Sequence, residues 1–469
     1  MVYFYRAPAT GGDDVPGRDS PLSTRLQLFP ITVQVEDGQN SKSLSIAGLS
    51  LNKLAEQYST PLYLYDQATL DADLDAYLHS LHRHYPGSSG ITYAGKAFLD
   101  LAMAQWVKWR QISLDCSSVG EMYIASQAGL PRQQVVSHGA NKSDADLQFA
   151  LQYAGSLVVD NITELNRLIG LHARIVPDPT LNFPDIWLRF KPGVSVQTHS
   201  HIQTGQPDSK FGLDAQEFIQ AVGLCLKHNL PLKGLHFHLG SHLHTSQPLV
   251  TALEIAIDLM QECQRQTGWL PTVICPGGGW GVPYHEADLP HLPIENLVAA
   301  LARTLVTQCQ ALNIPLFHLQ LEPGRSLVAR AGVAIYRVGA VKHTTNRRYL
   351  FLDGGIADNP RPSLYRARYS ALPVNDPFRQ PTSPAWLAGP YCESGDVLLE
   401  DILLPILQPG ELVAVPVSGA YQLSMSSNYN GACKPAVLWL NHQQAQLIQA
   451  RETPSDLVRR DLPLTSLGT

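Results

Sequence analysis

The chain has 469 residues, of which 44% are hydrophobic and 16% are charged, and its formal net charge is -6. This length is sufficient for two domains with sizeable cores, and the small acidic excess gives no electrostatic footprint for nucleic acid or for an anionic membrane. Because the sequence has no uninterrupted run of about 18 apolar residues, no secretory signal and no paired set of cysteines, we expect a cytoplasmic protein.

The first segment, residues 1–25, is rich in Gly, Asp, Pro and Ser and predicts a flexible tail. We expect residues 26–59 to contribute to a β domain. From residue 60 to residue 330, short apolar runs alternate with longer stretches of helical periodicity, and the first run is PLYLYD at 61–66. This alternation indicates βαβ units, and a number of runs close to eight favours a closed (β/α)8 barrel over an open sheet.

The residue composition and its pattern change in residues 331–469. Runs such as VAIYRVGAVK and PAVLWLN are rich in β-branched and aromatic residues, and they are separated by Gly, Pro and Asn. This pattern is typical of an all-β domain. The predicted fold class is therefore α/β, a (β/α)8 barrel with a second, all-β domain.

Residues suited to chemistry follow the predicted barrel strands. They are Lys96 in ITYAGKAF, His238 in GLHFHLGS, the glycines 277–279 in ICPGGGWG, and Glu322 and Arg325 in LEPGR. Active sites of such barrels lie at the carboxyl ends of the strands, so we expect these groups to meet at one mouth.

Read singly, these segments leave alternatives open. Lys96 is either a lysine that snorkels from a strand end or a nucleophile whose pKa is lowered by apolar surroundings. His236 and His238 fit a zinc hydrolase, a hydrogen-bonded strand end or stacking on a cofactor. The glycines form either a tight turn or a phosphate cradle. Cys392 and Tyr421, read alone, are most simply structural.

The ordered set of motifs is more specific. YAGKAF, HxHxGS, GGGxG, EPGR, CESGD and GAYxxSMSSNYN resemble, in this order, the signatures of the alanine-racemase-like, fold type III pyridoxal-phosphate decarboxylases. The CESGDVL and SSNYN segments most resemble diaminopimelate decarboxylases. Further matches are HGANKS at 138–143 and a stretch at 192–212, and the resemblance extends from about residue 60 to residue 440.

The resemblance implies pyridoxal 5'-phosphate as cofactor and assigns roles by position. Lys96 would bind the cofactor covalently, His238 would stack on its ring, and Glu322 would pair with the ring nitrogen. A carboxylate at this nitrogen keeps it protonated, which favours a decarboxylase over a racemase. The remaining implied cofactor-binding residues, which hold the phosphate region, are Ser241, Gly279, Gly324, Arg325 and Tyr421.

The family also implies a substrate site. Arg361 and Tyr365, with Arg325 and Tyr421, resemble the residues that hold the substrate, and the guanidinium groups would grip a distal carboxylate. Glu393 resembles the residue that accepts a distal ammonium. Cys392, a catalytic residue in the resemblance beside Lys96, His238 and Glu322, would reach with Glu393 into a partner subunit. The resemblance therefore implies a homodimer with shared active sites.

We therefore expect decarboxylation of meso-2,6-diaminopimelate to L-lysine and CO2, with no metal and no nucleic-acid or membrane partner. The chain departs from the family pattern in IADNP at 356–360, at His242 and at Trp280. Alternatives are a related decarboxylase of ornithine, lysine, carboxynorspermidine or a specialised metabolite, and a non-catalytic cofactor-binding homologue.

Overall fold

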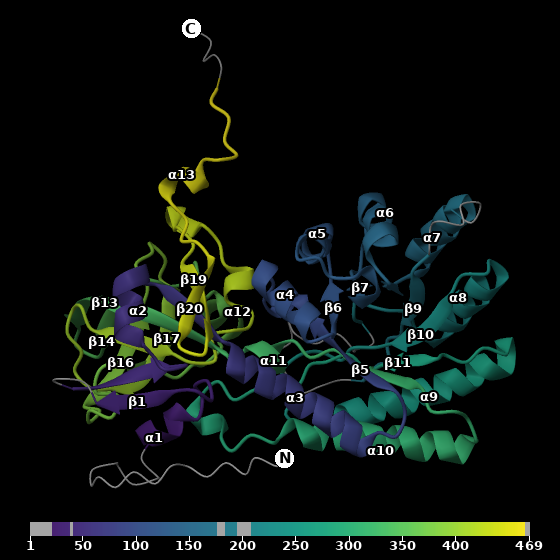
Figure 1. Ribbon diagram of the computed structural model, residues 1–469, viewed down its shortest axis with the longest axis horizontal. Helices are drawn as coiled ribbons and strands as arrows, with labels where there is room; N and C mark the ends of the chain where they lie inside the picture. The colour runs from purple at the N-terminus through teal and green to yellow at the C-terminus, as the bar shows by residue number, and fades with distance from the viewer. Residues whose placement is uncertain (1–20, 38–40, 176–182, 195–207, 465–469) are drawn as a thin grey trace.

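The computed structural model describes residues 21–37, 41–175, 183–194 and 208–464 (Figure 1). Residues 1–20, most of the predicted tail, lie outside this part of the chain. Residues 21–25 do not form a tail, because they belong to helix α1 (Pro21–Leu26), whose Arg25 forms a buried ion pair with Glu286.

Eight parallel strands form a closed barrel, as the alternation of apolar runs predicts. The strands follow one another in chain order around the barrel, and β12 closes it by pairing with β5 through Leu319 and Ser89. The barrel strands are β5 (Ser89–Ala94), β6 (Ser113–Cys116), β7 (Val135–Ser137), β8 (Ser156–Val159), β9 (Asp185–Arg189), β10 (Leu232–His236), β11 (Val273–Cys275) and β12 (His318–Leu321).

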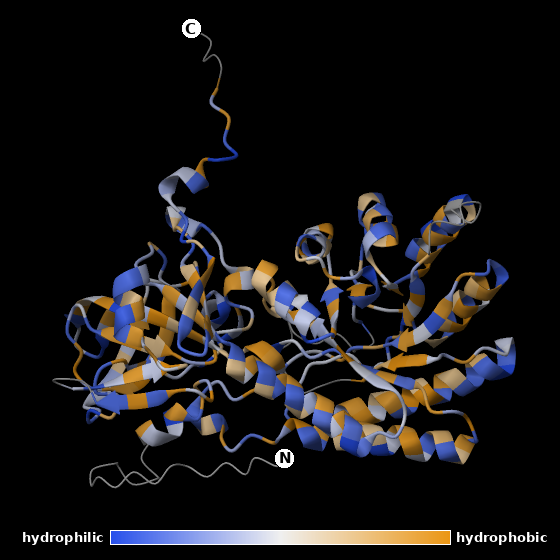
Figure 2. Cartoon of the chain, viewed as in Figure 1, coloured by the Kyte–Doolittle hydropathy of each residue, from blue (hydrophilic) through white to orange (hydrophobic). Residues whose placement is uncertain are grey.

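Helices of mixed hydropathy surround the barrel, and Figure 2 shows both hydrophobic and hydrophilic residues along them. In α9, for example, the buried residues Leu249, Leu253, Ala256 and Met260 recur at helical spacing, so one stripe packs inward. The helices are α3 (Gln67–His84), α4 (Leu101–Trp109), α5 (Val119–Gln127), α6 (Asp144–Tyr153), α7 (Ile162–Ile175), α8 (Ala215–Lys227), α9 (Gln247–Thr267), α10 (Ile294–Leu312) and α11 (Arg325–Val328).

Local signals fix where several helices begin. Ser143 and Asp146 form a capping box at α6, and Asp214 and Glu217 form another at α8.

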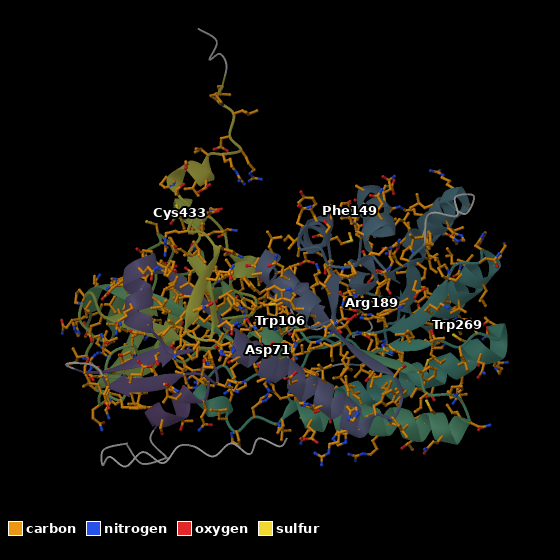
Figure 3. All side chains as sticks on the ribbon, in the orientation of Figure 1. Asp71, Trp106, Phe149, Arg189, Trp269 and Cys433 are labelled. Atoms are coloured by element: carbon orange, nitrogen blue, oxygen red, sulfur yellow. The ribbon has the colours of Figure 1, made fainter. Side chains whose placement is uncertain are left out.

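Helices α3 and α4 are joined by the indole of Trp106, which donates a hydrogen bond of 3.0 Å to Asp71 (Figure 3). No helix in the described part of the chain is long and apolar enough to cross a membrane.

A second, nine-stranded sheet lies beside the barrel (Figure 1). Its strands are mostly those of the β-rich region, as predicted. They are β4 (Leu62–Asp66), β13 (Gly332–His343), β14 (Arg348–Leu352), β15 (Leu372–Pro373), β16 (Ser383–Ala388), β17 (Val397–Leu404), β18 (Leu412–Val415), β19 (Ala436–Asn441) and β20 (Gln444–Gln449).

The run at 61–66 is not a barrel strand, contrary to the prediction. It forms β4, which pairs with β13 through Tyr65 and Gly332 and with β19 through Leu62 and Ala436. All five residues of β4 are buried. A short run that is apolar on both faces looks the same in either sheet, so its periodicity could not place it.

The N-terminal segment packs on the second sheet. Phe29, Leu44 and Ile46 belong to one buried cluster with Leu62 of β4 and Val333 of β13. The elements of this segment are β1 (Gln34–Asp37), β2 (Lys42–Ile46), β3 (Leu49–Ser50) and α2 (Leu51–Tyr58).

The two sheets are connected at the mouth of the barrel. The backbone N–H of Tyr421, in the β-rich region, donates a hydrogen bond of 2.8 Å to the carbonyl of Ala97, just after β5. The hydroxyl of Ser424 donates to the same carbonyl at 3.2 Å. The second domain therefore supplies side chains to the end of the barrel where the strands β5 to β12 finish.

Candidate active site

A cavity of about 350 Å³ opens at the carboxyl ends of the barrel strands. It brings together all the predicted cofactor-binding residues, which lie up to 325 residues apart in the chain (421 minus 96). These residues are Lys96, His238, Ser241, Gly279, Glu322, Gly324, Arg325 and Tyr421. Asp115, His138, Arg189 and His236 also line this cavity, and Figure 3 labels Arg189 among the barrel strands.

Lys96 lies in a short 3-10 helix, Gly95–Ala97, that follows strand β5 directly. Its side chain is exposed to the cavity, and within the described residues no hydrogen bond to its ammonium group is formed. A Cβ at the preceding residue, Gly95, would lie 2.8 Å from the carbonyl oxygen of Asp115, so only glycine fits the close approach to strand β6. The amine is thus free to react with a carbonyl in the cavity.

Glu322, just after β12, is held by two histidines from non-adjacent strands of the barrel: His138 directly follows β7, and His236 is the last residue of β10. Nε2 of His138 lies 3.1 Å from Oε1 of Glu322, and Nε2 of His236 lies 2.9 Å from Oε2. All three side chains are buried, and the two imidazole rings meet edge to face with centroids 5.0 Å apart. An ionised carboxylate only accepts hydrogen bonds, so both imidazoles must donate to it.

The charges in this triad follow from burial and pairing. Burial acts to raise the pKa of Glu322, but His236 and His138 outweigh it and hold that pKa well below its usual range. Burial acts to lower the pKa of His138, but Asp115 and Glu322 outweigh it and raise that pKa. Burial lowers the pKa of His236 to about 4. The triad therefore contains an ionised Glu322 beside a neutral His236, and the carboxylates of Asp115 and Glu322 favour the charged form of His138.

The triad also bears on the zinc alternative. The possible ligand atoms of His138, His236 and Glu322 lie within 4.8 Å of one another, which is close enough for one ion. However, an imidazole nitrogen that donates its hydrogen to a carboxylate has no lone pair for a metal. The two direct hydrogen bonds therefore favour histidines that orient the carboxylate over histidines that bind zinc. His238, the second histidine of the strand motif, does not belong to this cluster.

His238 lies two residues beyond the end of β10, is half-buried and lines the cavity. Burial, with help from the nearby charge of Lys96, holds its pKa well below its usual value, so the ring is neutral. Its Nδ1 accepts a hydrogen bond of 3.4 Å from the backbone N–H of Gly278. A neutral aromatic ring with a fixed orientation is suited to stacking against a flat heterocycle.

The glycine loop after β11 forms a cradle that side chains would fill. A Cβ at Gly278 would lie 1.9 Å from the carbonyl oxygen of Glu322, and one at Gly279 would lie 2.1 Å from that of Gly240. Gly279 also has a φ of +104°, in the region that favours glycine. Backbone N–H groups without side chains are a common way to hold a phosphate.

Polar side chains from two other loops line the same end of the cavity. Ser241 Oγ accepts hydrogen bonds from Nε and Nη2 of Arg325 at 3.2 and 2.8 Å, and the Arg325 guanidinium lies 4.7 Å from the ring centre of Tyr421. An amine, an aromatic face, a carboxylate and an anion cradle thus surround one space. This set of donors fits pyridoxal phosphate, whose aldehyde, ring, ring nitrogen and phosphate need these four kinds of group.

Arg361 does not line this cavity, but it is connected to it. It is buried at the start of helix α12 (Arg361–Tyr365), donates a hydrogen bond to the hydroxyl of Tyr369, and has its guanidinium 4.4 Å from the ring centre of Tyr284. Arg325 Nη1 donates to the hydroxyl of the same Tyr284 at 2.5 Å. The two predicted substrate arginines are therefore joined through Tyr284.

Tyr284 was missed by the sequence reasoning, as was the part that His138 and His236 play beside Glu322. Burial acts to raise the pKa of Tyr284, but the guanidinium groups of Arg325 and Arg361 outweigh it and lower that pKa. The sequence carries a signal for this residue only in its position after the glycine loop, in GGGWGVPY. The predicted match at 192–212 falls largely outside the described residues.

The remaining predicted site residues, Tyr365 and Glu393 for the substrate and Cys392 for catalysis, do not line the cavity of their own chain. Tyr365 is half-buried on α12, and Cys392 and Glu393 are exposed in the loop between β16 and β17. The backbone N–H of Cys392 donates to Oδ1 of Asn430 at 3.0 Å, and Glu393 accepts from the N–H of Gly395 at 3.1 Å. A single chain does not bring Cys392 or Glu393 to Lys96.

Comparison with known proteins identifies a family of pyridoxal-dependent enzymes. Residues 71–329 match the model of the pyridoxal-dependent decarboxylase family, pyridoxal binding domain. The chain is 37% identical to the diaminopimelate decarboxylase of Synechocystis sp. over 97% of each sequence, and 37% identical to that of Bacillus subtilis over 90% of this chain and 95% of the relative.

Solved structures give the same result. The crystal structure of diaminopimelate decarboxylase from M. jannaschii matches 92% of this chain and 98% of its own, with a TM-score of 0.84 and 28% identity. The Helicobacter pylori diaminopimelate decarboxylase, complexed with L-lysine, matches 87% of this chain and 98% of its own, with a TM-score of 0.78 and 29% identity.

Proposed function

Since the chain belongs to the diaminopimelate decarboxylases within the pyridoxal-dependent decarboxylase family, we propose that it converts meso-2,6-diaminopimelate to L-lysine and CO2. The single observation that carries this proposal is the cavity in which Lys96, His238 and Glu322 meet a phosphate cradle. The protein is thus a carboxy-lyase that uses pyridoxal 5'-phosphate. When bound, this cofactor supplies the electron sink for the electron pair that loss of CO2 leaves on the substrate.

Glu322 has the central electrostatic part. It is ionised and buried, and its two oxygens already accept from His138 and His236, so its position is fixed before any ligand arrives. Such a carboxylate holds a proton on an adjacent pyridine nitrogen. We propose that His138 and His236 are positioning residues that keep Glu322 ionised and oriented.

The other cavity residues bind and orient. Lys96 offers the amine that bonds to the cofactor, and His238 offers a neutral ring on which the heterocycle stacks. Gly279 and Gly324 leave room for the phosphate, while Ser241, Arg325 and Tyr421 provide polar groups beside it. Because these groups already surround one cavity in the folded chain, the cofactor is bound by residues that are close together before it arrives.

We propose that Arg361 and Arg325 receive the distal carboxylate of the substrate, near Tyr365 and Tyr421. In support of this, the pair is linked through Tyr284, and Arg361 is buried without an acidic partner among the described residues. Glu393 would accept the distal ammonium. The two arginines and Glu393 together would thus bind both charged groups at the distal end of diaminopimelate, its carboxylate and its ammonium.

We also propose a homodimer in which Cys392, as a catalytic residue, and Glu393 enter the cavity of the partner. Both are exposed in their own chain, and large apolar side chains are exposed as well, including Trp109 at 68% and Leu462 at 91%. We propose two domains, in which residues 60–330 bind the cofactor and residues 331–469 complete the site. All seven cysteines are free thiols, which supports a cytoplasmic location.

The test is a CO2-release assay with pyridoxal phosphate and a panel of meso-diaminopimelate, L-lysine and L-ornithine. Release from diaminopimelate alone supports the proposal. Equal release from lysine or ornithine would reduce it to a decarboxylase of another diamino acid, and no release from any of them would reject it.

A further inference from the structure

A second cavity, of about 730 Å³, lies behind the glycine loop and shares no lining residue with the first. Its walls come from helix α3, from the loop that follows Gly279, and from the segment that leads into α10. The charged and aromatic residues that line it are Asp73, Tyr77, Trp280, Glu295 and Arg330, together with His79 and His291.

Asp73 is a carboxylate without a close partner. It is half-buried, and among the described residues it forms no hydrogen bond and no ion pair. Burial raises its pKa to about 7, and Arg330 opposes that rise only in part. A carboxylate that is taken out of water without a partner is costly, so a cation at this place would stabilise it.

Arg330 supplies the opposite charge in the same cavity. Its Nε donates to the carbonyl of Phe29 at 3.0 Å, and its terminal nitrogens make no hydrogen bond to any residue that the structure describes. It forms no ion pair with Asp73. The cavity therefore offers an acceptor for an ammonium group and, separately, donors for a carboxylate.

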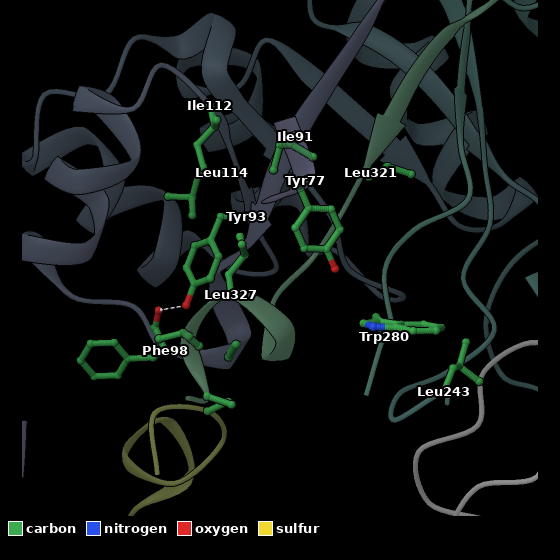
Figure 4. Close-up of a cluster of buried hydrophobic side chains, with 14 of the residues drawn as sticks. Tyr77, Ile91, Tyr93, Phe98, Ile112, Leu114, Leu243, Trp280, Leu321 and Leu327 are labelled. Atoms are coloured by element: carbon green, nitrogen blue, oxygen red, sulfur yellow. Dashed lines mark hydrogen bonds between the residues drawn. The ribbon is translucent and has the colours of Figure 1, made fainter. Parts of the chain in front are cut away.

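Apolar and aromatic groups form the rest of the wall. Tyr77 and Trp280 both line the cavity, and Figure 4 shows the Tyr77 hydroxyl directed toward the side on which the Trp280 indole lies. That hydroxyl lies 2.7 Å from Oγ of Ser326, so it is already hydrogen-bonded. Glu295 is likewise occupied, by Arg83 and His84. Of the carboxylate and guanidinium groups that line the cavity, Asp73 and Arg330 are therefore the two left for a ligand.

We propose that this cavity is a second, non-catalytic binding site for a small zwitterionic amino acid. The ammonium group of the ligand pairs with Asp73, its carboxylate pairs with Arg330, and its aliphatic part lies against Trp280 and Tyr77. The volume falls within the usual range for small-molecule sites, about 300–1,000 Å³. Trp280 follows Gly279 directly, and Ser326 follows Arg325, so an occupant contacts segments that also form the phosphate end of the active site.

Equilibrium dialysis of the holoenzyme with labelled L-lysine tests the proposal, because lysine carries both charges. Asp73→Asn should bind one lysine fewer per chain than wild type while it keeps the decarboxylase activity. Asp75→Asn is the matched control, since Asp75 lies on the same helix but pairs with Arg110, and it should bind as wild type. Arg330→Gln should weaken this site roughly tenfold or more, and cadaverine, which lacks the carboxylate, should bind it roughly tenfold or more less tightly than lysine.

The difference between wild type and Asp73→Asn is measured without turnover, so it holds even if the active site takes another substrate. If the active site does not bind lysine, wild type binds one lysine per chain and Asp73→Asn binds none. If the active site does bind lysine, the numbers are two and one. Equal lysine binding by wild type and a folded Asp73→Asn protein would overturn the proposal. Folding is checked by thermal unfolding, and because Asp73 has no close partner we expect no loss of stability from Asp73→Asn.

Discussion

Replacement of Glu322 by Gln should weaken the protein before any cofactor is bound. The carboxylate accepts one hydrogen bond on each oxygen, from His138 and from His236. A glutamine amide offers one acceptor and one donor, so one imidazole N–H must face an N–H of the amide. The buried His138 also loses the negative charge of Glu322, which helps to raise its pKa.

The size of this effect follows from the burial of the triad. A hydrogen bond to a charged group contributes about 1.5–3 kcal/mol, and leaving a buried donor unsatisfied costs a similar amount. Since the imidazole tautomers can partly adjust, we expect a loss on the order of 3 kcal/mol in the free energy of unfolding of the apo-protein. In the holoenzyme, loss of the proton on the ring nitrogen should lower kcat roughly 10²-fold or more.

Urea unfolding of both apo-proteins measures the first effect, with Glu254→Gln, at an exposed position of helix α9, as control. The pH dependence provides an internal check. Because the folded pKa of Glu322 lies below the unfolded value of about 4.3, its contribution is complete above that pH and disappears as the pH falls through the folded pKa. A difference between wild type and Glu322→Gln below about 0.5 kcal/mol at neutral pH would refute this account of the triad.

Three further outcomes are expected. Lys96→Ala should abolish turnover and the visible absorbance of the lysine-bound cofactor, and retention of a tenth of the activity would argue against its role. Mixed Lys96→Ala and Glu393→Ala proteins should recover about a quarter of wild-type activity through hybrid dimers with one intact site, whereas no recovery after verified subunit exchange would place both residues in one chain's site. Arg361→Ala should cost on the order of 2–5 kcal/mol in transition-state binding of diaminopimelate and much less with lysine or ornithine, as kcat/KM for each substrate would reveal.

The barrel could be predicted because its strands and helices alternate regularly, and parallel strands place their carboxyl ends at one mouth. That rule alone brings Lys96, His238 and Glu322 together. It fails for β4, whose five buried residues carry no period that separates one sheet from the other. The composition of the N-terminal segment, rich in Gly, Asp, Pro and Ser, also did not predict that residues 21–25 form a helix instead of a tail.

Side-chain contacts between segments that are far apart in the chain could not be predicted from the sequence. His138 and Glu322 are 184 positions apart, and no local pattern announces that their side chains meet. Tyr284 joins two arginines that lie 41 and 77 positions after it in the chain, and only the folded chain brings its ring to Arg361 and its hydroxyl to Arg325. The place of Cys392 and Glu393 depends on a second subunit, so a single chain leaves that part of the expectation as a proposal.

The most direct test of the central claim is the product balance of the purified holoenzyme with meso-diaminopimelate. The account predicts that one L-lysine and one CO2 form for each substrate consumed, and that neither forms with Lys96→Ala. Consumption of diaminopimelate without CO2, or release of CO2 by the Lys96→Ala protein at a comparable rate, would contradict it.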